Sequence, residues 1–159
     1  MNYSKARYSA FDTALYYITF KDRTEKEIQD KLKEKGYSYS DIDVAVSKLK
    51  EYGYINEENY AFSYIKSNIH KKGYRRISSE LAARGLDKDI IEEQLDMFDF
   101  SEEDTIYNIL DSRFSNCDMS DEKQLRRIYS FFARRGFSYG NISNALSKYR
   151  KNTKILFDL

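Results

Sequence analysis

The residue types that most often carry catalysis or bind transition metals are scarce in this chain. It contains one histidine, His70, and one cysteine, Cys117, which stand far apart in the sequence. A cysteine–histidine nucleophile pair needs the two side chains adjacent and oriented by a third group, and a transition-metal site needs further ligands. The glycines are isolated at predicted helix junctions, so no glycine-rich phosphate loop is present. We therefore expect His70 at the solvent edge of a helix, no enzymatic activity and no cofactor.

Two acidic clusters could in principle hold Mg²⁺. They are Glu57-Glu58 and Glu102-Glu103-Asp104. Both fall in the predicted first turns of helices, where the partial positive charge of a helix N-terminus favours carboxylates. Helix stabilisation accounts for both clusters, so we expect no metal site.

The basic residues carry a stronger signal because they are unevenly distributed. The chain as a whole has a formal net charge of +1, which indicates nothing about a polyanionic partner. Residues 123–157, however, contain nine Lys or Arg and no Asp or Glu, so the last third should have an electropositive face. A second basic cluster surrounds Gly73. The candidate partner- or nucleic-acid-binding residues are Lys71, Lys72, Arg75, Arg76, Arg84, Arg126, Arg127, Arg134, Arg135, Arg150 and Lys151.

Three interpretations of these basic residues are open. They could form an ordinary solvated face, attract nucleic-acid phosphates with a strong salt dependence, or meet an acidic protein surface. Aromatic residues lie among the charges of the last third and could either stack on unpaired bases or pack in the core. They are Tyr129, Phe131, Phe137 and Tyr139.

The elements that position these residues recur along the chain. Three glycines, Gly36, Gly85 and Gly136, each follow a basic residue and are spaced 49 and 51 residues apart. Apolar residues lie eight and four positions before each glycine and six, ten and thirteen positions after it, as one face of each of two helices requires. In the first copy these positions are Ile28, Leu32, Ile42, Val46 and Leu49; in the second, Ile77, Leu81, Ile91, Leu95 and Phe98; in the third, Ile128, Phe132, Ile142, Leu146 and Tyr149. This register predicts an internal repeat.

We predict an all-α fold of three tandem three-helix repeats forming an elongated, curved helical array. The repeats are expected at 7–56, 57–100 and 101–151, with a C-terminal tail at 152–159. Helix starts are indicated by a capping box from Thr24 to Glu27, by Ser40 with Asp43, by Asp87 and by Ser101 with Asp104. The three glycines should end helices in the left-handed conformation.

Composition agrees with a helical protein of a reducing compartment. There is no proline, and proline most disfavours helix interiors. A single cysteine cannot form an intramolecular disulfide. No charged-then-apolar leader and no apolar run long enough for a bilayer are present. We expect a soluble, cytoplasmic protein without membrane contact.

Three segments together resemble the RecX family, small bacterial regulators of the RecA recombinase. The first, residues 17–60, reads YITFKDRTEKEIQDKLKEKGYSYSDIDVAVSKLKEYGYINEENY. The second, residues 71–86, reads KKGYRRISSELAARGL, and the third, residues 125–142, reads LRRIYSFFARRGFSYGNI. The three occur in the family's order and span nearly all of residues 10–150.

The resemblance implies a non-enzymatic regulatory protein of DNA repair, recombination and the SOS response. It would lie in the groove of the RecA–single-stranded DNA filament and restrain ATP hydrolysis and strand exchange. The implied partner is thus the recombinase filament, with DNA also open as a direct partner, and we expect the chain to be a monomer. The alternative is a stand-alone nucleic-acid-binding helical-repeat module without a recombinase partner, since the basic residues by themselves name no partner.

Overall fold

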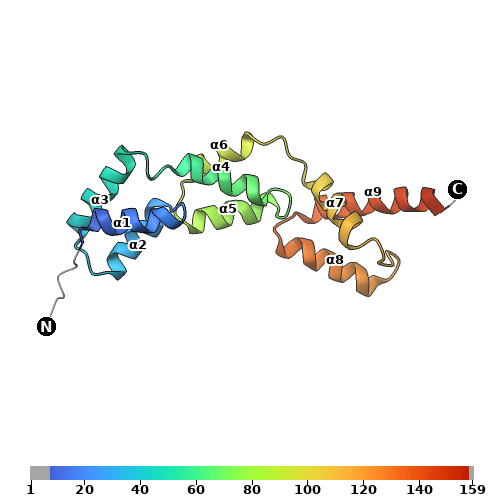
Figure 1. The fold of residues 1–159 in the computed structure, drawn as a ribbon. Helices are drawn as coiled ribbons and strands as arrows, with labels where there is room; N and C mark the ends of the chain where they lie inside the picture. Colours follow the sequence, from blue (N-terminus) through green and yellow to red (C-terminus); the bar gives the residue numbers. More distant parts are fainter. Residues whose placement is uncertain (1–7, 158–159) are drawn as a thin grey trace. The chain divides into compact units, whose positions relative to one another are not determined.

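All regular secondary structure that the computed structural model describes, in residues 8–157, is α-helical, as predicted. Side chains are described up to residue 153. The helices follow one another through short connections (Figure 1). They are α1 (Ala10–Phe20), α2 (Glu25–Glu34), α3 (Tyr39–Glu51), α4 (Glu57–Asn68), α5 (Tyr74–Ala83), α6 (Lys88–Asp96), α7 (Glu102–Arg113), α8 (Glu122–Arg134) and α9 (Tyr139–Phe157). We call α1–α3 the first group, α4–α6 the middle group and α7–α9 the last group.

Short polar side chains begin several of these helices. Thr24 and Glu27 form the predicted capping box before α2, and Ser101 accepts the amide of Asp104 before α7. The predicted start at Ser40 is wrong: Ser38 caps α3 by accepting the amide of Asp41. The helix begins two residues earlier because Ser38 and Asp41 have the same spacing as Ser40 and Asp43 and form the cap, with the Ser38 hydroxyl also donating to the Asp41 carboxylate at 2.7 Å.

The last helix is longer than the sequence analysis predicted. It was expected to end near Lys151, but α9 continues to Phe157, so most of the predicted tail at 152–159 is helical. No proline or glycine occurs after Gly140 to end the helix. Residues 158 and 159 lie outside the described part of the chain.

The chain forms two compact units. The first comprises the residues up to 64 together with 81–94, and the second comprises 65–80 together with 95 onward. The division falls within all three helices of the middle group, while the first and last groups each lie within one unit. The repeat boundaries at 56, 100 and 151 remain predictions.

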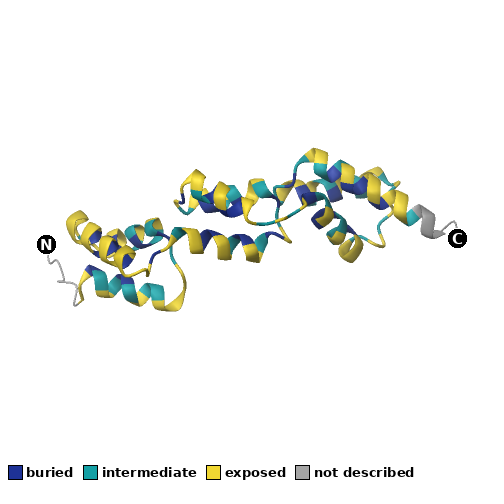
Figure 2. Cartoon of the chain, turned by 90° about the horizontal axis from the view of Figure 1, so that it is seen from above, coloured by how far each residue is buried: buried dark blue, intermediate teal, exposed yellow. Residues whose placement is uncertain are grey.

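Each unit has a core built from the predicted stripes, and most helices are buried along one side and exposed along the other (Figure 2). In the first group α1, α2 and α3 all pack against one another, and in the last group α9 packs against both α7 and α8. Of the fifteen predicted positions, Phe98 alone is partly exposed. The buried hydrophobic cluster of the first group is Ala10, Ala14, Ile28, Leu32, Ile42, Ala45, Val46, Leu49 and Ile55. That of the last group is Ile106, Leu110, Ile128, Phe132, Phe137, Ile142, Ala145, Leu146 and Tyr149.

Within the first unit, the start of α2 lies against the end of α5. The buried Thr24 hydroxyl donates to the carbonyl of Arg84 at 2.7 Å, and Lys26 Nζ donates to the carbonyl of Ala83 at 3.2 Å. These carbonyls belong to the end of a helix, where they have no partner within the helix itself. A Cβ at Gly85 would lie 2.6 Å from Lys26 Cβ. We call this contact the first joint.

An equivalent contact, the second joint, recurs inside the second unit between the start of α5 and the end of α8. The amide of Gly73 donates to the carbonyl of Arg135 at 2.9 Å. A Cβ at Gly136 would lie 2.5 Å from the backbone nitrogen of Arg76, and one at Gly73 would lie 2.5 Å from the carbonyl oxygen of Gly136. Thr24 and Gly73 hold the same position, twelve residues before the next glycine of the repeat, as do Arg84 and Arg135 directly before it. The same pairing therefore joins each group to the next.

The second joint explains an unusual cap on α5. Because Gly73 must be glycine to fit against Gly136, it has no side chain with which to cap the helix it precedes. Glu102 of α7 supplies the acceptor: its buried carboxylate accepts the amide of Tyr74 at 2.7 Å and the Asn141 side-chain amide at 2.6 Å. Glu102 therefore ties α5, α7 and α9 together and does more than stabilise its own first turn.

Alanine at Gly36, Gly85 and Gly136 should destabilise the fold in that increasing order. All three have positive φ, so each change costs about 1–2 kcal/mol of left-handed strain. A Cβ at Gly36 meets nothing within 4 Å, whereas at Gly85 it meets a lysine side chain and at Gly136 it meets backbone, which adds roughly 1–3 kcal/mol of overpacking. Urea unfolding followed by circular dichroism measures the three costs. Equal costs would mean that the joints are not tightly packed.

Glu102→Ala should lower the free energy of unfolding by about 1–3 kcal/mol, because it leaves the amides of Tyr74 and Asn141 without their acceptor. Glu102→Gln should cost less, since one oxygen remains to accept. The control is Glu103→Ala, which loses one exposed hydrogen bond to Asn144 and should cost no more than about 0.5 kcal/mol. Urea midpoints of the three variants measure these costs. If Glu102→Ala costs no more than Glu103→Ala, Glu102 does not cap α5.

Candidate functional site

The predicted basic residues are divided between the two units. Arg84 belongs to the first unit, and the other ten belong to the second unit. Within the second unit they come from three stretches, the start of α5, α8 and α9, and the second joint brings the first two stretches together at Arg76 and Arg135. Each set has different partners, which decide how free its charges are to bind another molecule.

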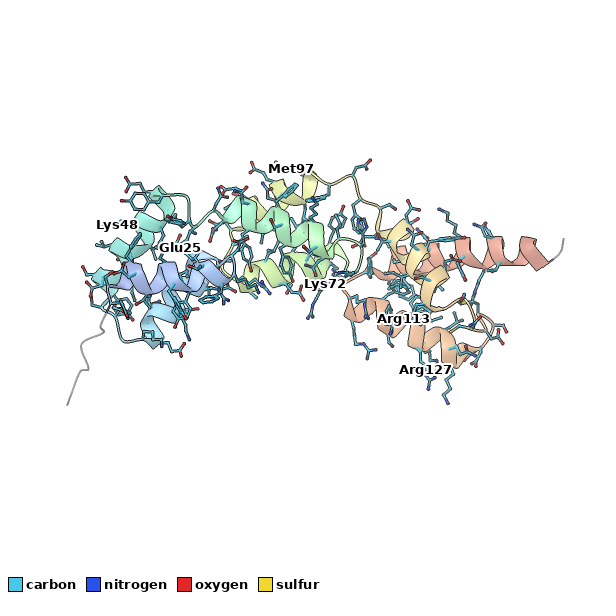
Figure 3. All side chains as sticks on the ribbon, viewed as in Figure 1. Glu25, Lys48, Lys72, Met97, Arg113 and Arg127 are labelled. Carbon is cyan, nitrogen blue, oxygen red and sulfur yellow. The ribbon has the colours of Figure 1, made fainter. Side chains whose placement is uncertain are left out.

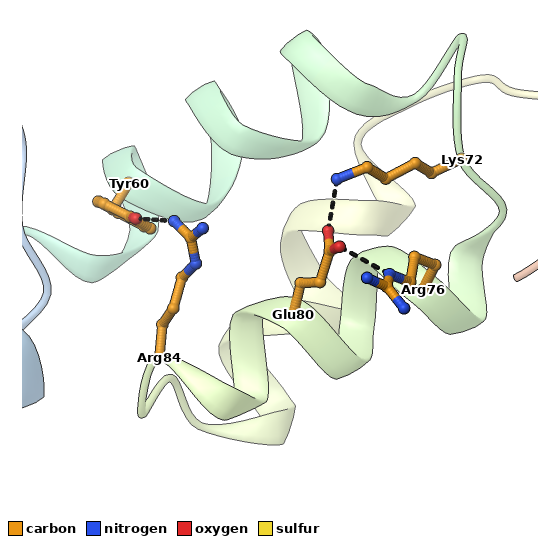
Figure 4. A network of polar contacts seen from close by, with 5 residues as sticks. All are labelled: Tyr60, Lys72, Arg76, Glu80 and Arg84. Atoms are coloured by element: carbon orange, nitrogen blue, oxygen red, sulfur yellow. Dashed lines mark hydrogen bonds and ion pairs between the residues drawn. The ribbon is translucent and has the colours of Figure 1, made fainter. Parts of the chain in front are cut away.

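At the start of α5, half of the predicted cations are neutralised internally. Glu80 accepts from Lys72 Nζ at 2.6 Å and from Arg76 Nε at 2.7 Å (Figure 4). The Glu80 side chain is only 21% exposed. The backbone of Arg76 also forms part of the second joint. Lys71 and Arg75 are exposed. The pair with Arg76 was foreseeable from sequence, because Glu80 follows Arg76 by one helical turn, whereas the pair with Lys72 was not.

Arg84 also has a structural role. Its guanidinium donates to the Tyr60 hydroxyl (Figure 4). The guanidinium carbon also lies 4.7 Å from the centre of the Tyr64 ring. Its carbonyl accepts the hydroxyl of Thr24 in the first joint. Both the guanidinium and the backbone carbonyl of Arg84 thus form contacts inside the first unit.

The outer face of α8 is the least neutralised of the basic surfaces. Arg126, Arg127 and Arg134 are exposed, and they line an open groove of about 720 Å³ together with Lys123 and Ser130. At about 100° per residue, these positions share one side of the helix. Arg127 projects from that side in Figure 3. Two acids, Asp121 and Glu122, also line the groove. Glu122 forms an exposed 3.2 Å pair with Arg126 that contributes little, and Asp121 accepts the Lys123 amide and the Gln124 side-chain amide.

Beside this groove, two arginines from different helices lie against one aromatic ring. The guanidinium carbon of Arg135 is 3.5 Å from the centre of the Phe131 ring, and that of Arg113, from the end of α7, is 5.0 Å away. Burial, followed by the nearby charges of Arg113 and Arg134, lowers the pKa of Arg135. Sequence reasoning missed Arg113, because no periodicity or motif connects α7 with α8.

The basic residues of α9 are mostly occupied or isolated. Arg150 donates to the carbonyl of Met119 in the polar loop after α7, and Lys148 pairs with Asp104 at 3.2 Å. Lys151 is exposed. The predicted arginine and lysine of α9 therefore do not join the α8 groove.

Of the four aromatic residues predicted near these charges, one presents an open ring. Phe137 is buried in the core, and Phe131 is covered by Arg113 and Arg135 and by the edges of Phe114 and Phe132. The rings of Tyr129 and Tyr139 stack at 5.1 Å with an interplanar angle of 24°. Tyr139 is nevertheless 74% exposed, so the face of its ring turned away from Tyr129 is open.

Among the described residues, no three His, Cys, Asp or Glu side chains are grouped so that they could hold a metal ion. Over the same part of the chain, no helix combines the length and the apolar character that a bilayer span requires. His70 is exposed, with its ring 6.4 Å from that of Phe100.

Comparison with known proteins gives consistent matches. Residues 10–49 match the first three-helix domain of RecX, and residues 56–95 match the second three-helix domain of RecX. The regulatory protein RecX of Caldanaerobacter subterraneus is 34% identical over 150 residues, covering 92% of this chain and 73% of that protein. The regulatory protein RecX of Finegoldia magna is 34% identical over 141 residues, covering 82% of this chain and 66% of that protein. The crystal structure of RecX from Lactobacillus salivarius aligns with a TM-score of 0.73 at 26% identity, covering 89% of this chain and 94% of that one.

Lys71→Gln and Lys72→Gln remove the same charge from neighbouring positions, but they should differ in stability. Loss of Lys72 leaves the half-buried Glu80 with one partner fewer, which should cost about 1 kcal/mol. Loss of the exposed Lys71 should change stability by no more than about 0.5 kcal/mol. Urea midpoints measure both, and equal values would show that Glu80 does not depend on Lys72.

Proposed function

Because this chain belongs to the RecX family of regulatory proteins, we propose that it regulates homologous recombination and DNA repair by binding the RecA–single-stranded DNA filament. On this proposal it acts as a cytoplasmic monomer that lies in the filament groove and restrains ATP hydrolysis and strand exchange. The family's name supplies the regulatory role, and the recombinase partner is implied by the family resemblance of the three motif segments.

The observation that carries the proposal is the outer face of α8. Arg127 and Arg134 have no ion-pair partner among the described residues, and the only acid paired with Arg126 is the exposed Glu122. A filament of recombinase on DNA presents both carboxylates and phosphates, and arginine binds either with two parallel hydrogen bonds. By contrast, Arg76 and Arg84 are engaged within the chain. We therefore place the filament contact on α8, with Lys71 and Arg75 as secondary contacts.

The triple variant Arg126→Glu, Arg127→Glu, Arg134→Glu should lose inhibition of RecA ATP hydrolysis on single-stranded DNA. Charge reversal replaces attraction to the filament by repulsion while leaving the buried side of α8 unchanged. The assay titrates each protein against a preformed filament, starting well below the recombinase concentration. Wild type is expected to inhibit at substoichiometric amounts, because each bound molecule would act on a filament and not on a single subunit.

The matched control is Lys33→Glu, Lys48→Glu, which reverses two exposed charges of the first unit. It should inhibit like wild type, and circular dichroism should show equal helix content in all variants. Full inhibition by the α8 variant would exclude α8 as the contact. No inhibition by wild type itself would reject the proposed function and favour a nucleic-acid-binding module without a recombinase partner.

A further inference from the structure

We propose that the outer face of α8, together with Arg113 and Tyr139, binds a single strand of nucleic acid directly, with phosphates on the arginines and an unpaired base stacked on Tyr139. The inference rests on the proposed function only in identifying that strand with the DNA of the recombinase filament. The binding itself needs no recombinase.

The first support is the arginine pair on Phe131. Arg113 and Arg135 lie on the same ring, at 5.0 and 3.5 Å, so two positive charges are held close together. None of Arg113, Arg134 and Arg135 forms an ion pair with a carboxylate of the described residues. Arg135 gives one hydrogen bond to the carbonyl of Phe131, and each guanidinium has five N–H donors. A phosphate placed between Arg113 and Arg135 would accept from both and relieve their repulsion.

The second support is the shape of the surface between the charges. Ser130, which is small and exposed, occupies the middle of the outer face of α8. A small side chain lets an extended chain pass close to the helix, while the arginines beside it can reach toward that chain. The groove of about 720 Å³ lies over this part of the helix.

The third support is the position of the open tyrosine. Tyr129 and Phe131 lie about 100° to either side of Ser130 on α8. The Tyr129–Tyr139 stack therefore borders one edge of the basic face, and the arginine-covered Phe131 borders the other. Stacking on Tyr129 orders the Tyr139 ring in advance, and its other face is open to a base.

These features together favour an unpaired strand over the other polyanions. An acidic protein surface would use the arginines but would gain nothing from an open aromatic ring. A duplex offers phosphates but keeps its bases stacked inside. Only a single strand presents phosphates and unpaired base faces together, and base–aromatic stacking does not depend on the base.

The test is fluorescence anisotropy of a short labelled oligothymidylate titrated with the full chain, without recombinase, at several salt concentrations. Tyr139→Ala should weaken binding about fivefold or more through the lost stacking. Arg113→Gln should weaken binding and reduce the slope of log affinity against log salt by about 0.7, the value expected for one phosphate contact on a single strand.

The chain offers matched controls for both changes. Tyr39 is 76% exposed and is the first residue of α3, as Tyr139 is of α9, and Lys33 lies 5.7 Å from its ring. Tyr39→Ala thus removes an equally exposed tyrosine beside a cation in the first unit and should leave binding unchanged. Lys48→Gln is the control for Arg113→Gln: it removes an exposed positive charge from the first unit and should leave binding unchanged.

A duplex of the same length should bind more weakly and be insensitive to Tyr139→Ala. Oligothymidylate binding that is unchanged in Tyr139→Ala and Arg113→Gln, or weakened equally by the control substitutions, would overturn the inference. If those variants lose strand binding but still inhibit the recombinase, the strand site stands apart from inhibition. If wild type binds the strand but does not inhibit, the inference holds and the proposed function fails.

Discussion

The fold depends on one contact that occurs twice: the start of a second helix in one group lies against the glycine that ends the second helix of the next. Thr24 and Gly73 each donate a hydrogen bond to the carbonyl before that glycine, Arg84 or Arg135. The contact is close enough that Gly85 and Gly136 have no room for a Cβ. The contact therefore gives a hydrogen-bond donor to a carbonyl at the end of a helix. It also brings two groups into close contact and restricts Gly85 and Gly136 to glycine. Gly36 has a similar positive φ, but a Cβ there would meet nothing within 4 Å. Gly36 is therefore favoured by its backbone conformation alone, whereas Gly85 and Gly136 are favoured by both conformation and lack of space.

Contacts within each unit determine which basic residues remain available. Arg76 and Arg84 lie in the repeat near the joints, and each is drawn into local contacts, with Glu80 or with the tyrosines of α4. The start of α8 is built differently. It is capped by Asp121, and the helix begins three residues before the position that corresponds to the start of α5. Arg126, Arg127 and Arg134 of α8 are exposed, and both proposals rest on this surface.

The two proposals give α8 different partners: the recombinase filament in the first, and a single strand of nucleic acid in the second. Regulation of a recombinase filament requires a surface that recognises protein and nucleic acid together, and the arginines of α8 can bind either. The tyrosine at the edge of that surface adds a feature that only unpaired bases use. A strand contact on α8 would place the second unit against the DNA.

The sequence alone determined the helical class, the repeat register and the family resemblance, because all three are written in local spacing. Apolar residues three and four apart define a helix face. Thr24 begins a helix and Gly85 ends one through contacts with residues close to them in the sequence. It could not show that Glu102 caps a helix other than its own, that Glu80 withdraws Lys72 from the surface, or that Arg113 meets Arg135 on one ring. Those contacts join residues that are not neighbours on one helix, and a charge is free or paired according to what lies beside it in space. Only the tertiary structure brings those neighbours together, so only it could separate the cations that hold the fold from those left to bind a partner.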